Sequence, residues 1–158
     1  MCIRDRRDTI EILRRGWSVL AIDAQASAIE TLKKRLELDE LKTRLVTKVS
    51  RFENAFWSGA DLVNSSFALP LCWKTDFLDI WQRVYDSLRS GGRFSGQLFG
   101  DRDGWAGNPT NTHFTLAEVQ GLIEHYDIEE FWEEETDSVT PRGTPKHWHI
   151  YHIVARKP

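Results

Sequence analysis

The sequence predicts an α/β fold, in which one sheet carries helices on both of its faces. A short apolar run at 19–23, rich in branched residues, ends on an acid and leads at once into the helical pattern of 27–38. The same succession of strand and helix recurs further along the chain, which then finishes with two strand-like runs. Alternation of this kind is typical of sheets built largely from parallel strands.

Length and composition fit one globular domain over residues 1–158, with 41% hydrophobic and 28% charged residues. The net charge of −3, without a basic block, argues against a nucleic-acid partner. No apolar run approaches the roughly 18 residues of a membrane span, and the charged start is no secretory signal. Cys2 and Cys72 have no metal-ligand spacing. We expect a cytoplasmic protein with free thiols.

In the first half of the chain, segments with helical spacing of apolar residues alternate with short apolar runs typical of strands. Helices are predicted at 8–15, with Ile10, Ile12 and Leu13 inward, and at 27–38, with Ile29, Leu32 and Leu36 inward. Gly16 ends the first helix. Strands are predicted at 19–23, buried on both faces, at 45–49, and from 61 through the polar residues 64–66.

The second half begins with the longest predicted helix, 73–90, which has Trp81 on its apolar face and stops at Gly91-Gly92. A strand at 93–99 and a glycine-rich loop at 100–111 follow. Thr115 and Glu118 have the spacing of a capping box and open a helix that runs to about residue 126. Final strands are predicted at 128–134 and 147–156.

Candidate site residues follow several predicted strands at their carboxyl ends, where open α/β sheets bind ligands. They are Asp23, Phe52-Glu53, the trio 64–66 and the loop 100–104. Each has a simpler interpretation: Asp23 or Ser27 caps the next helix, Glu53 is a surface acid, the trio forms a turn, and Asp101 and Asp103 are loop acids. Their joint placement favours a binding site.

Four stretches together resemble class I S-adenosylmethionine-dependent methyltransferases, and among these the small bacterial tellurite-resistance-type enzymes. The stretches are "RRDTIEILRRGWSVLAIDAQASAIETL", "ADLVNSSFALPLC", "LRSGGRFSGQLFGDRDGW" and "PKHWHIYHIVARKP". The resemblance implies a Rossmann-like sheet, S-adenosylmethionine as cofactor, and methyl transfer to an unidentified small molecule.

The resemblance also implies roles for individual residues. Asp23 would hold the cofactor ribose, Phe52 and Glu53 would lie by the adenine, and Asn64 and Ser65 would line the methionine side. The full cofactor-binding set is Asp8, Asp23, Ala24, Phe52, Glu53, Asn64 and Ser65. By their position beside the predicted crevice, Phe67, Trp105 and His113 are candidates for the acceptor pocket; the simpler interpretations are burial of a loop for Trp105 and a surface histidine for His113. No catalytic nucleophile is expected, because positioning drives a methyl displacement.

One part of the family pattern is missing from this sequence. A first strand and a glycine-rich loop should precede Asp8, but no glycine occurs before Gly16, and "MCIRDRR" is too charged for a central strand. We interpret the chain as truncated, with residues 1–6 foreign or disordered. The loss should leave a gap in the sheet or force 19–23 to pair with 61–64, and should leave cofactor binding weak or absent.

Other interpretations remain open. His147 and His149 share one face of a predicted strand and His152 lies on the other, so we expect strand packing and edge polarity rather than a metal site. An acid after a strand also suits the ribose of a nicotinamide cofactor, so an oxidoreductase is one alternative. A non-catalytic interaction module is another.

Overall fold

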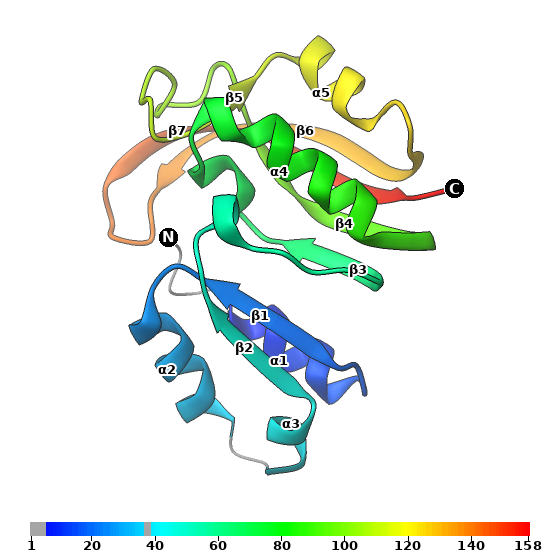
Figure 1. Cartoon of the computed structure of the whole chain (residues 1–158). Coiled ribbons are helices and arrows are strands. Elements are labelled where there is room, and N and C mark those ends of the chain that lie inside the picture. The colour runs from blue at the N-terminus through cyan, green and yellow to red at the C-terminus, as the bar shows by residue number, and fades with distance from the viewer. Residues whose placement is uncertain (1–5, 37–38) are drawn as a thin grey trace. The chain divides into compact units, whose positions relative to one another are not determined.

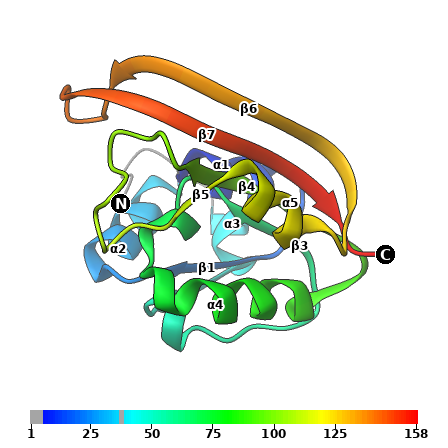
Figure 2. The ribbon, with the colours of Figure 1, turned by 90° about the horizontal axis from the view of Figure 1, so that it is seen from above.

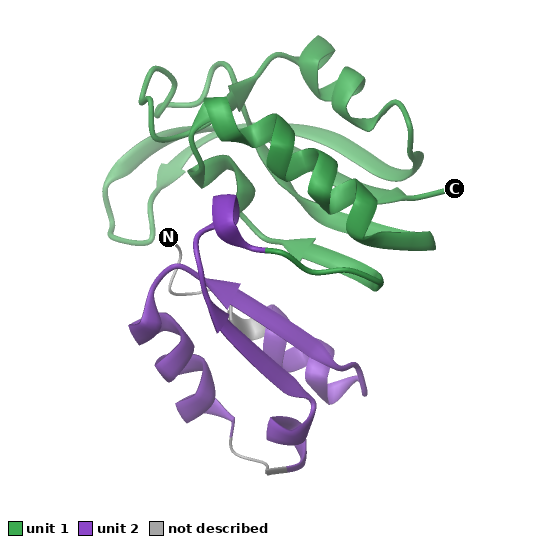
Figure 3. Ribbon diagram, in the orientation of Figure 1, with its two compact units in different colours: residues 1, 56–158 green, residues 2–55 purple. Residues whose placement is uncertain are grey.

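The computed structural model describes residues 6–36 and 39–158 of the chain (Figure 1). These residues form two compact units, one ending at Ala55 and the other covering 56–158 (Figure 3). We call them unit 2 and unit 1, as in the figure. Residues 1–5 of the predicted foreign segment lie outside the described residues, whereas Arg6 begins a helix. No described helix has the length and apolarity to cross a membrane.

Unit 2 is built around two parallel strands. Its elements are α1 (Arg6–Arg14), β1 (Val19–Asp23), α2 (Ala26–Arg35), α3 (Asp39–Thr43), β2 (Leu45–Val49) and the 3-10 turn η1 (Phe52–Asn54). Pairing runs in register from Val19 with Leu45 to Asp23 with Val49. Both predicted strands are confirmed at their bounds, whereas the short helix α3 was not predicted.

A small apolar core holds unit 2 together. Leu13, Leu36 and Leu41 are buried, and partly buried Ile10, Val19 and Leu45 pack against them. Gly16 ends the first helix with a φ of +93°, a conformation that suits glycine, and its N–H donates to the Leu13 carbonyl. The inward face predicted for this helix is therefore confirmed.

The predicted burial of β1 on both faces is wrong for this chain. None of its residues is buried, and Leu20 keeps 42% of its surface exposed, opposite Val46 at 64%. The reason is that β1 pairs with β2 alone among the described strands, so its sheet has only two strands. The strand at 19–23 does not pair with β3, which belongs to the other sheet.

Unit 1 contains a five-stranded sheet. Its elements are β3 (Ala60–Ser65), η2 (Leu69–Leu71), α4 (Lys74–Ser87), β4 (Leu88–Gly100), β5 (His113–Phe114), α5 (Leu116–Ile123), β6 (Asp127–Val139) and β7 (Pro145–Arg156). The strand order is β3-β4-β7-β6, with β5 on β4. β3 and β5 run parallel to β4, whereas β7 and β6 are antiparallel. Figure 2 shows the β6–β7 hairpin as a long curved ribbon.

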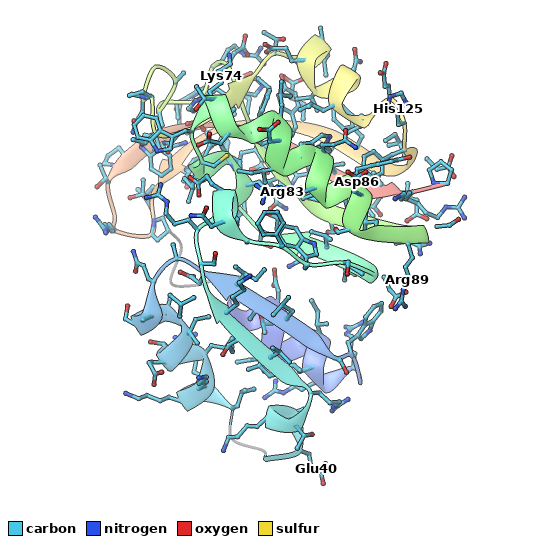
Figure 4. All side chains as sticks on the ribbon, viewed as in Figure 1. Glu40, Lys74, Arg83, Asp86, Arg89 and His125 are labelled. Atoms are coloured by element: carbon cyan, nitrogen blue, oxygen red, sulfur yellow. The ribbon has the colours of Figure 1, made fainter. Side chains whose placement is uncertain are left out.

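The core of unit 1 lies between α4 and the sheet. Trp81 of α4 packs edge-on against Phe94 of β4, with ring centroids 4.8 Å apart, and its Nε1 donates to the Leu122 carbonyl. Its predicted place in the core is confirmed. Lys74 and Asp86 lie on the exposed side of the same helix (Figure 4).

The helix α4 ends three residues before its predicted limit. Leu88 is already extended and pairs with Ala60, so it belongs to β4 rather than to the helix. Gly91, with a φ of +78°, falls where the register between β3 and β4 shifts. The glycine pair therefore marks an irregularity inside the strand. The capping box of Thr115 and Glu118 is confirmed, and α5 ends at Ile123.

Candidate functional site

Asp23 lies at the carboxyl end of β1, where its carboxylate meets the start of α2. Its Oδ1 accepts a hydrogen bond of 2.8 Å from the N–H of Gln25, which is the N-cap residue of that helix. Ser27 lies inside α2, so the idea that it caps the helix is wrong. The contact with Gln25 is the local one expected of an acid in a strand-to-helix turn.

The other candidate cofactor residues of unit 2 lie on three elements. Asp8 is in the first turn of α1, and Ala24 is exposed directly after β1. Phe52 and Glu53 open the turn η1 after β2, both partly buried, and Glu53 forms an ion pair of 3.3 Å with Arg51. Asn64 and Ser65 belong to unit 1, so the predicted set is divided between the two units.

A strained turn follows β3 in unit 1. Ser65 is buried, and its Oγ accepts a hydrogen bond of 3.1 Å from the N–H of Leu69. Phe67, a predicted acceptor-pocket residue, has a φ of +51°, and its N–H donates to Oε1 of Gln97 at 3.1 Å. The left-handed region costs an ordinary residue about 1–2 kcal/mol. Hydrogen bonds from two sides hold this turn in place.

Asp103 is the most highly connected acid of unit 1. It lies in the loop after β4 with its side chain 0% exposed. One carboxylate oxygen accepts from Nζ of Lys146 at 2.5 Å and from the N–H of His149 at 3.2 Å, and the other accepts from the N–H of Trp105 at 2.9 Å. Nε2 of His113 is 3.7 Å from this second oxygen. Asp103 lies in a loop, as predicted, but its burial and its ion pair with Lys146 were not predicted.

The pKa values of Asp103 and Lys146 follow from their burial and from their hydrogen bonds. Burial raises the pKa of Asp103, but His113, Lys146 and the two backbone amides outweigh it and hold the pKa at about 2. Burial also lowers the pKa of Lys146, and the hydrogen bond that its ammonium donates to Asp103 acts against that shift. The two groups therefore form a buried ion pair at neutral pH.

Aromatic rings surround the ammonium group of Lys146. Its Nζ lies 3.5 Å from the ring centroid of Trp148, 4.4 Å from that of Trp105 and 5.3 Å from that of Phe99. Cation–π attraction of this kind strengthens when the cation is desolvated. No sequence signal pointed to Lys146 or Trp148, because the burial of a lysine depends on partners far away in the chain.

All three predicted acceptor-pocket residues lie in unit 1, and each contacts Phe99, Trp148 or both. Phe67 is 6.3 Å from Trp148 in an edge arrangement, and Trp105 is 5.6 Å from it. His113 stacks on Phe99 at 5.8 Å, and Trp105 meets that ring at 5.9 Å. The structure therefore brings Phe67, Trp105 and His113 into one aromatic cluster, at the end of the sheet where β3 and β4 finish.

A second polar network lies on the other face of β7. Arg102 donates to Glu133 at 2.6 Å and to Glu135 at 2.8 Å, and hydrogen bonds from Arg102 and then His147 lower the pKa of Glu135 to about 2. The fully buried His149 lies between them, and its Nε2 is 2.7 Å from Glu133.

Glu133, Glu135 and His149 are near enough to one another to hold a metal ion. Two observations argue for a structural network instead. Nδ1 of His149 accepts from the backbone N–H of Arg102, so a neutral ring carries its proton on Nε2, the atom that would ligate. The Arg102 guanidinium is already paired with both acids.

The remaining hairpin histidines lie on opposite faces, as predicted from strand alternation. His147 contacts Asp137 at 2.8 Å and Glu135 at 3.0 Å. His152 stacks on Trp132, with centroids 4.5 Å apart, and its Nε2 contacts Glu134 at 2.9 Å.

Comparison with known proteins gave matches only at the level of structure. No protein-family model and no curated protein sequence matches the chain. TehB from Haemophilus influenzae is similar with a TM-score of 0.80 at 16% identity, over 96% of this chain and 54% of TehB. This chain therefore spans about half the length of TehB.

Two further solved structures are methyltransferases. A S-adenosylmethionine-dependent methyltransferase from Methanosarcina mazei has a TM-score of 0.68 at 18% identity, over 94% of this chain and 86% of its own. The glycopeptide N-methyltransferase MtfA, complexed with S-adenosylhomocysteine, has a TM-score of 0.65 at 16% identity, over 96% and 77%. The fold of this chain is that of the class I S-adenosylmethionine-dependent methyltransferases.

Proposed function

We propose that this chain is the body of an enzyme that transfers a methyl group from S-adenosylmethionine to a small-molecule acceptor. The observation that carries the proposal is the likeness of fold to methyltransferases over nearly the whole chain. The acid at the end of β1 supports it, because carboxylates at this edge of such sheets accept hydrogen bonds from ribose hydroxyls.

The residues present fit this cofactor in part. Within unit 2, Asp23 suits the ribose and Phe52 suits an apolar contact with the adenine. The backbone cradle for the methionine does not fit, since the sequence has no glycine before Gly16. We therefore propose that this chain binds the cofactor weakly.

When bound, S-adenosylmethionine supplies a methyl group already activated by its sulfonium charge. The protein must then orient the acceptor and keep it in line, which needs no nucleophile of its own. We assign the acceptor side to Phe67, Trp105 and His113, which share contacts with Phe99 and Trp148. Tellurite resistance as a biological role rests only on the resemblance to TehB-type enzymes.

The test is a titration of the ¹⁵N-labelled chain with S-adenosylmethionine, followed by amide chemical shifts up to millimolar concentration. We expect the amides of Asp23, Phe52 and Glu53 to shift, with an affinity weaker than micromolar. Asp23→Asn should weaken binding about tenfold or more, because a charged hydrogen-bond acceptor is lost. Asp61→Asn, at an exposed acid paired with Arg89, is the matched control and should leave the shifts unchanged.

Different outcomes separate the alternatives. Shifts at the same amides with NADH instead of S-adenosylmethionine would favour an oxidoreductase. The absence of a response to either cofactor would favour an interaction module. Micromolar binding of S-adenosylmethionine would contradict the weak affinity, although it would support the activity.

A further inference from the structure

Phe67 occupies a backbone conformation that its side chain does not favour. Among the described residues it is the only non-glycine residue with a positive φ, at +51°. Asparagine and glycine enter this region readily, whereas an aromatic residue does so under strain. Strain that the surrounding structure imposes is concentrated at functional positions, so the outlier points to a role for the ring.

The strain is imposed by specific hydrogen bonds. The N–H of Phe67 donates to Gln97 on β4, and the turn is closed behind it by the bond from Leu69 to the buried Ser65 hydroxyl. Core packing does not account for the ring, because Phe67 is only partly buried. Glycine or asparagine would relieve the strain at this position, so the backbone conformation does not explain the presence of the ring.

The ring belongs to a continuous set of partly buried or exposed aromatic side chains. We call this set the aromatic wall; its members are Phe67, Trp105, Trp132, Trp148 and His152. Phe67 lies edge-on to Trp148 at 6.3 Å and to His152 at 6.5 Å. His152 in turn stacks on Trp132, which is 47% exposed.

Strand register places the wall on one face of the sheet. His152 is opposite both Gln97 on β4 and Trp132 on β6, and Trp148 is two pleats away from His152 on the same side of β7. Lys146 adds little charge to this face, because Asp103 neutralises it. The wall is therefore apolar and aromatic in character.

One polar atom lies beside the wall without a hydrogen bond. Nε2 of His113 is buried and has no hydrogen-bond partner in the part of the chain that the structure describes, and its side chain is 10% exposed. The ring stacks on Phe99, which itself contacts Trp105 and Trp148. The nearest acid, Asp103, is 3.7 Å from this nitrogen, beyond hydrogen-bond distance. An aromatic ligand that carries a hydroxyl group matches this combination of rings and one imidazole nitrogen without a hydrogen bond.

We propose that the aromatic wall binds a planar, hydroxylated aromatic ring and that Phe67 selects for it. As a statement about the methyl acceptor this rests on the proposed function, but binding itself does not need the cofactor. Flat rings gain from stacked and edge-on contacts with the wall, whereas a saturated ring of the same size gains only from burial.

The probe pair is 2-naphthol and its saturated counterpart decahydro-2-naphthol, titrated separately into the ¹⁵N-labelled chain without cofactor. We expect 2-naphthol to shift the indole N–H signals of Trp105 and Trp148 and the amides of Phe67 and Gln97. Its affinity should exceed that of the saturated alcohol by about three- to tenfold. Equal affinities, or no shift with 2-naphthol, would overturn the proposal.

Variants of Phe67 separate binding from folding. Phe67→Gly and Phe67→Asn both suit a positive φ and lack the ring, so they should melt no lower than the parent chain yet bind 2-naphthol at least about fivefold more weakly. Phe67→Tyr should retain binding. Phe56→Gly, which removes a ring that is 68% exposed and outside the wall, should bind like the parent.

Two results with these variants would overturn the proposal. One is unchanged binding in Phe67→Gly and Phe67→Asn. The other is a melting temperature well below that of the parent in both, since the ring would then serve packing alone. If 2-naphthol binds as expected and S-adenosylmethionine gives no response, only the proposed function fails; the reverse pattern removes only this inference.

Discussion

Unit 1 contains a strand with a buried face, β4, whereas neither strand of unit 2 has a buried residue. In β4 the side chains of Phe94, Leu98 and Phe99 are at most 1% exposed. In β1, an apolar strand up to its final acid, Leu20 is 42% exposed. β4 has paired strands on both sides, whereas β1 has one neighbour.

The difference shows that an apolar strand sequence does not by itself ensure burial. The strand is buried only where neighbouring strands and helices cover it. A sheet of two strands has little stability on its own, whereas three or more strands with a packed helix are sufficient. Unit 1 meets this condition with α4 against its sheet. We therefore expect unit 1 to be the more stable of the two.

The largest effect should come from breaking the buried ion pair of unit 1. Asp103→Ala leaves the Lys146 ammonium buried without its partner, which should cost about 3–5 kcal/mol of the free energy of unfolding. Urea unfolding followed by tryptophan fluorescence measures it. The exposed pair of Asp61 with Arg89 is the control, and Asp61→Ala should cost less than about 1 kcal/mol.

A cost in Asp103→Ala no greater than that of Asp61→Ala would contradict this assignment. The double variant Asp103→Ala with Lys146→Met sharpens it further. Removing both charges should recover part of the loss, since an apolar side chain no longer needs a buried partner.

Hydrogen exchange tests the comparison between the units directly. The free energies of opening for amides of β1 should lie about 2 kcal/mol or more below those of β4, because local opening ranges from near zero to the global value. The measurement is native-state exchange followed by NMR. Equal protection in β1 and β4 would show that unit 2 draws stability from a source outside its two-stranded sheet.

Helix caps give a smaller contrast. Thr115 caps α5 with both bonds of a capping box, whereas Gln25 at the start of α2 makes no side-chain cap. Thr115→Ala should lose about 1 kcal/mol, and Gln25→Ser should gain about 0.5–1 kcal/mol. Thermal unfolding of the two variants checks this, and a gain in the first or a loss in the second would contradict it.

The smallest effect should be a pH dependence at the β6–β7 hairpin. Asp137 and then Glu135 raise the pKa of His147, so protonation stabilises the folded hairpin. This contribution is complete below the unfolded value of about 6.5 and is lost as pH rises through the higher folded pKa. His147→Gln should therefore lower stability relative to the parent at pH 5.5 and match it at pH 9. A difference that grows with pH would contradict the assignment.

Local signals predicted much of the fold, and long-range pairing accounts for most of the misses. β1 and β2 were predicted at their bounds because their ends are marked by Asp23 and by the loop after Val49. The end of α4 was missed because Leu88 suits a helix face by its spacing, yet pairs with Ala60 across the sheet. The short stretch of sequence around a residue does not show which residue of another strand will pair with it.

The candidate site was predicted unevenly for the same reason. Phe67, Trp105 and His113 were placed near the strand ends from loop position alone, and they do share one cluster. The burial of Asp103 was not predicted, since it depends on Lys146, which lies 43 residues later. The roles predicted for Asp23 and the other cofactor residues stay predictions.

The neighbouring side chains of Arg102 and Asp103 bind residues on the two opposite faces of β7. Arg102 reaches the acids beyond His149, and Asp103 reaches Lys146. Inserting one residue directly after Gly100 would move each following residue by one position. Arg102 would then occupy the buried position beside Lys146 that now holds the Asp103 carboxylate. An insertion downstream of Trp105 would leave the contacts of Arg102 and Asp103 in place, so the tip is the part of this loop that can be lengthened without breaking them.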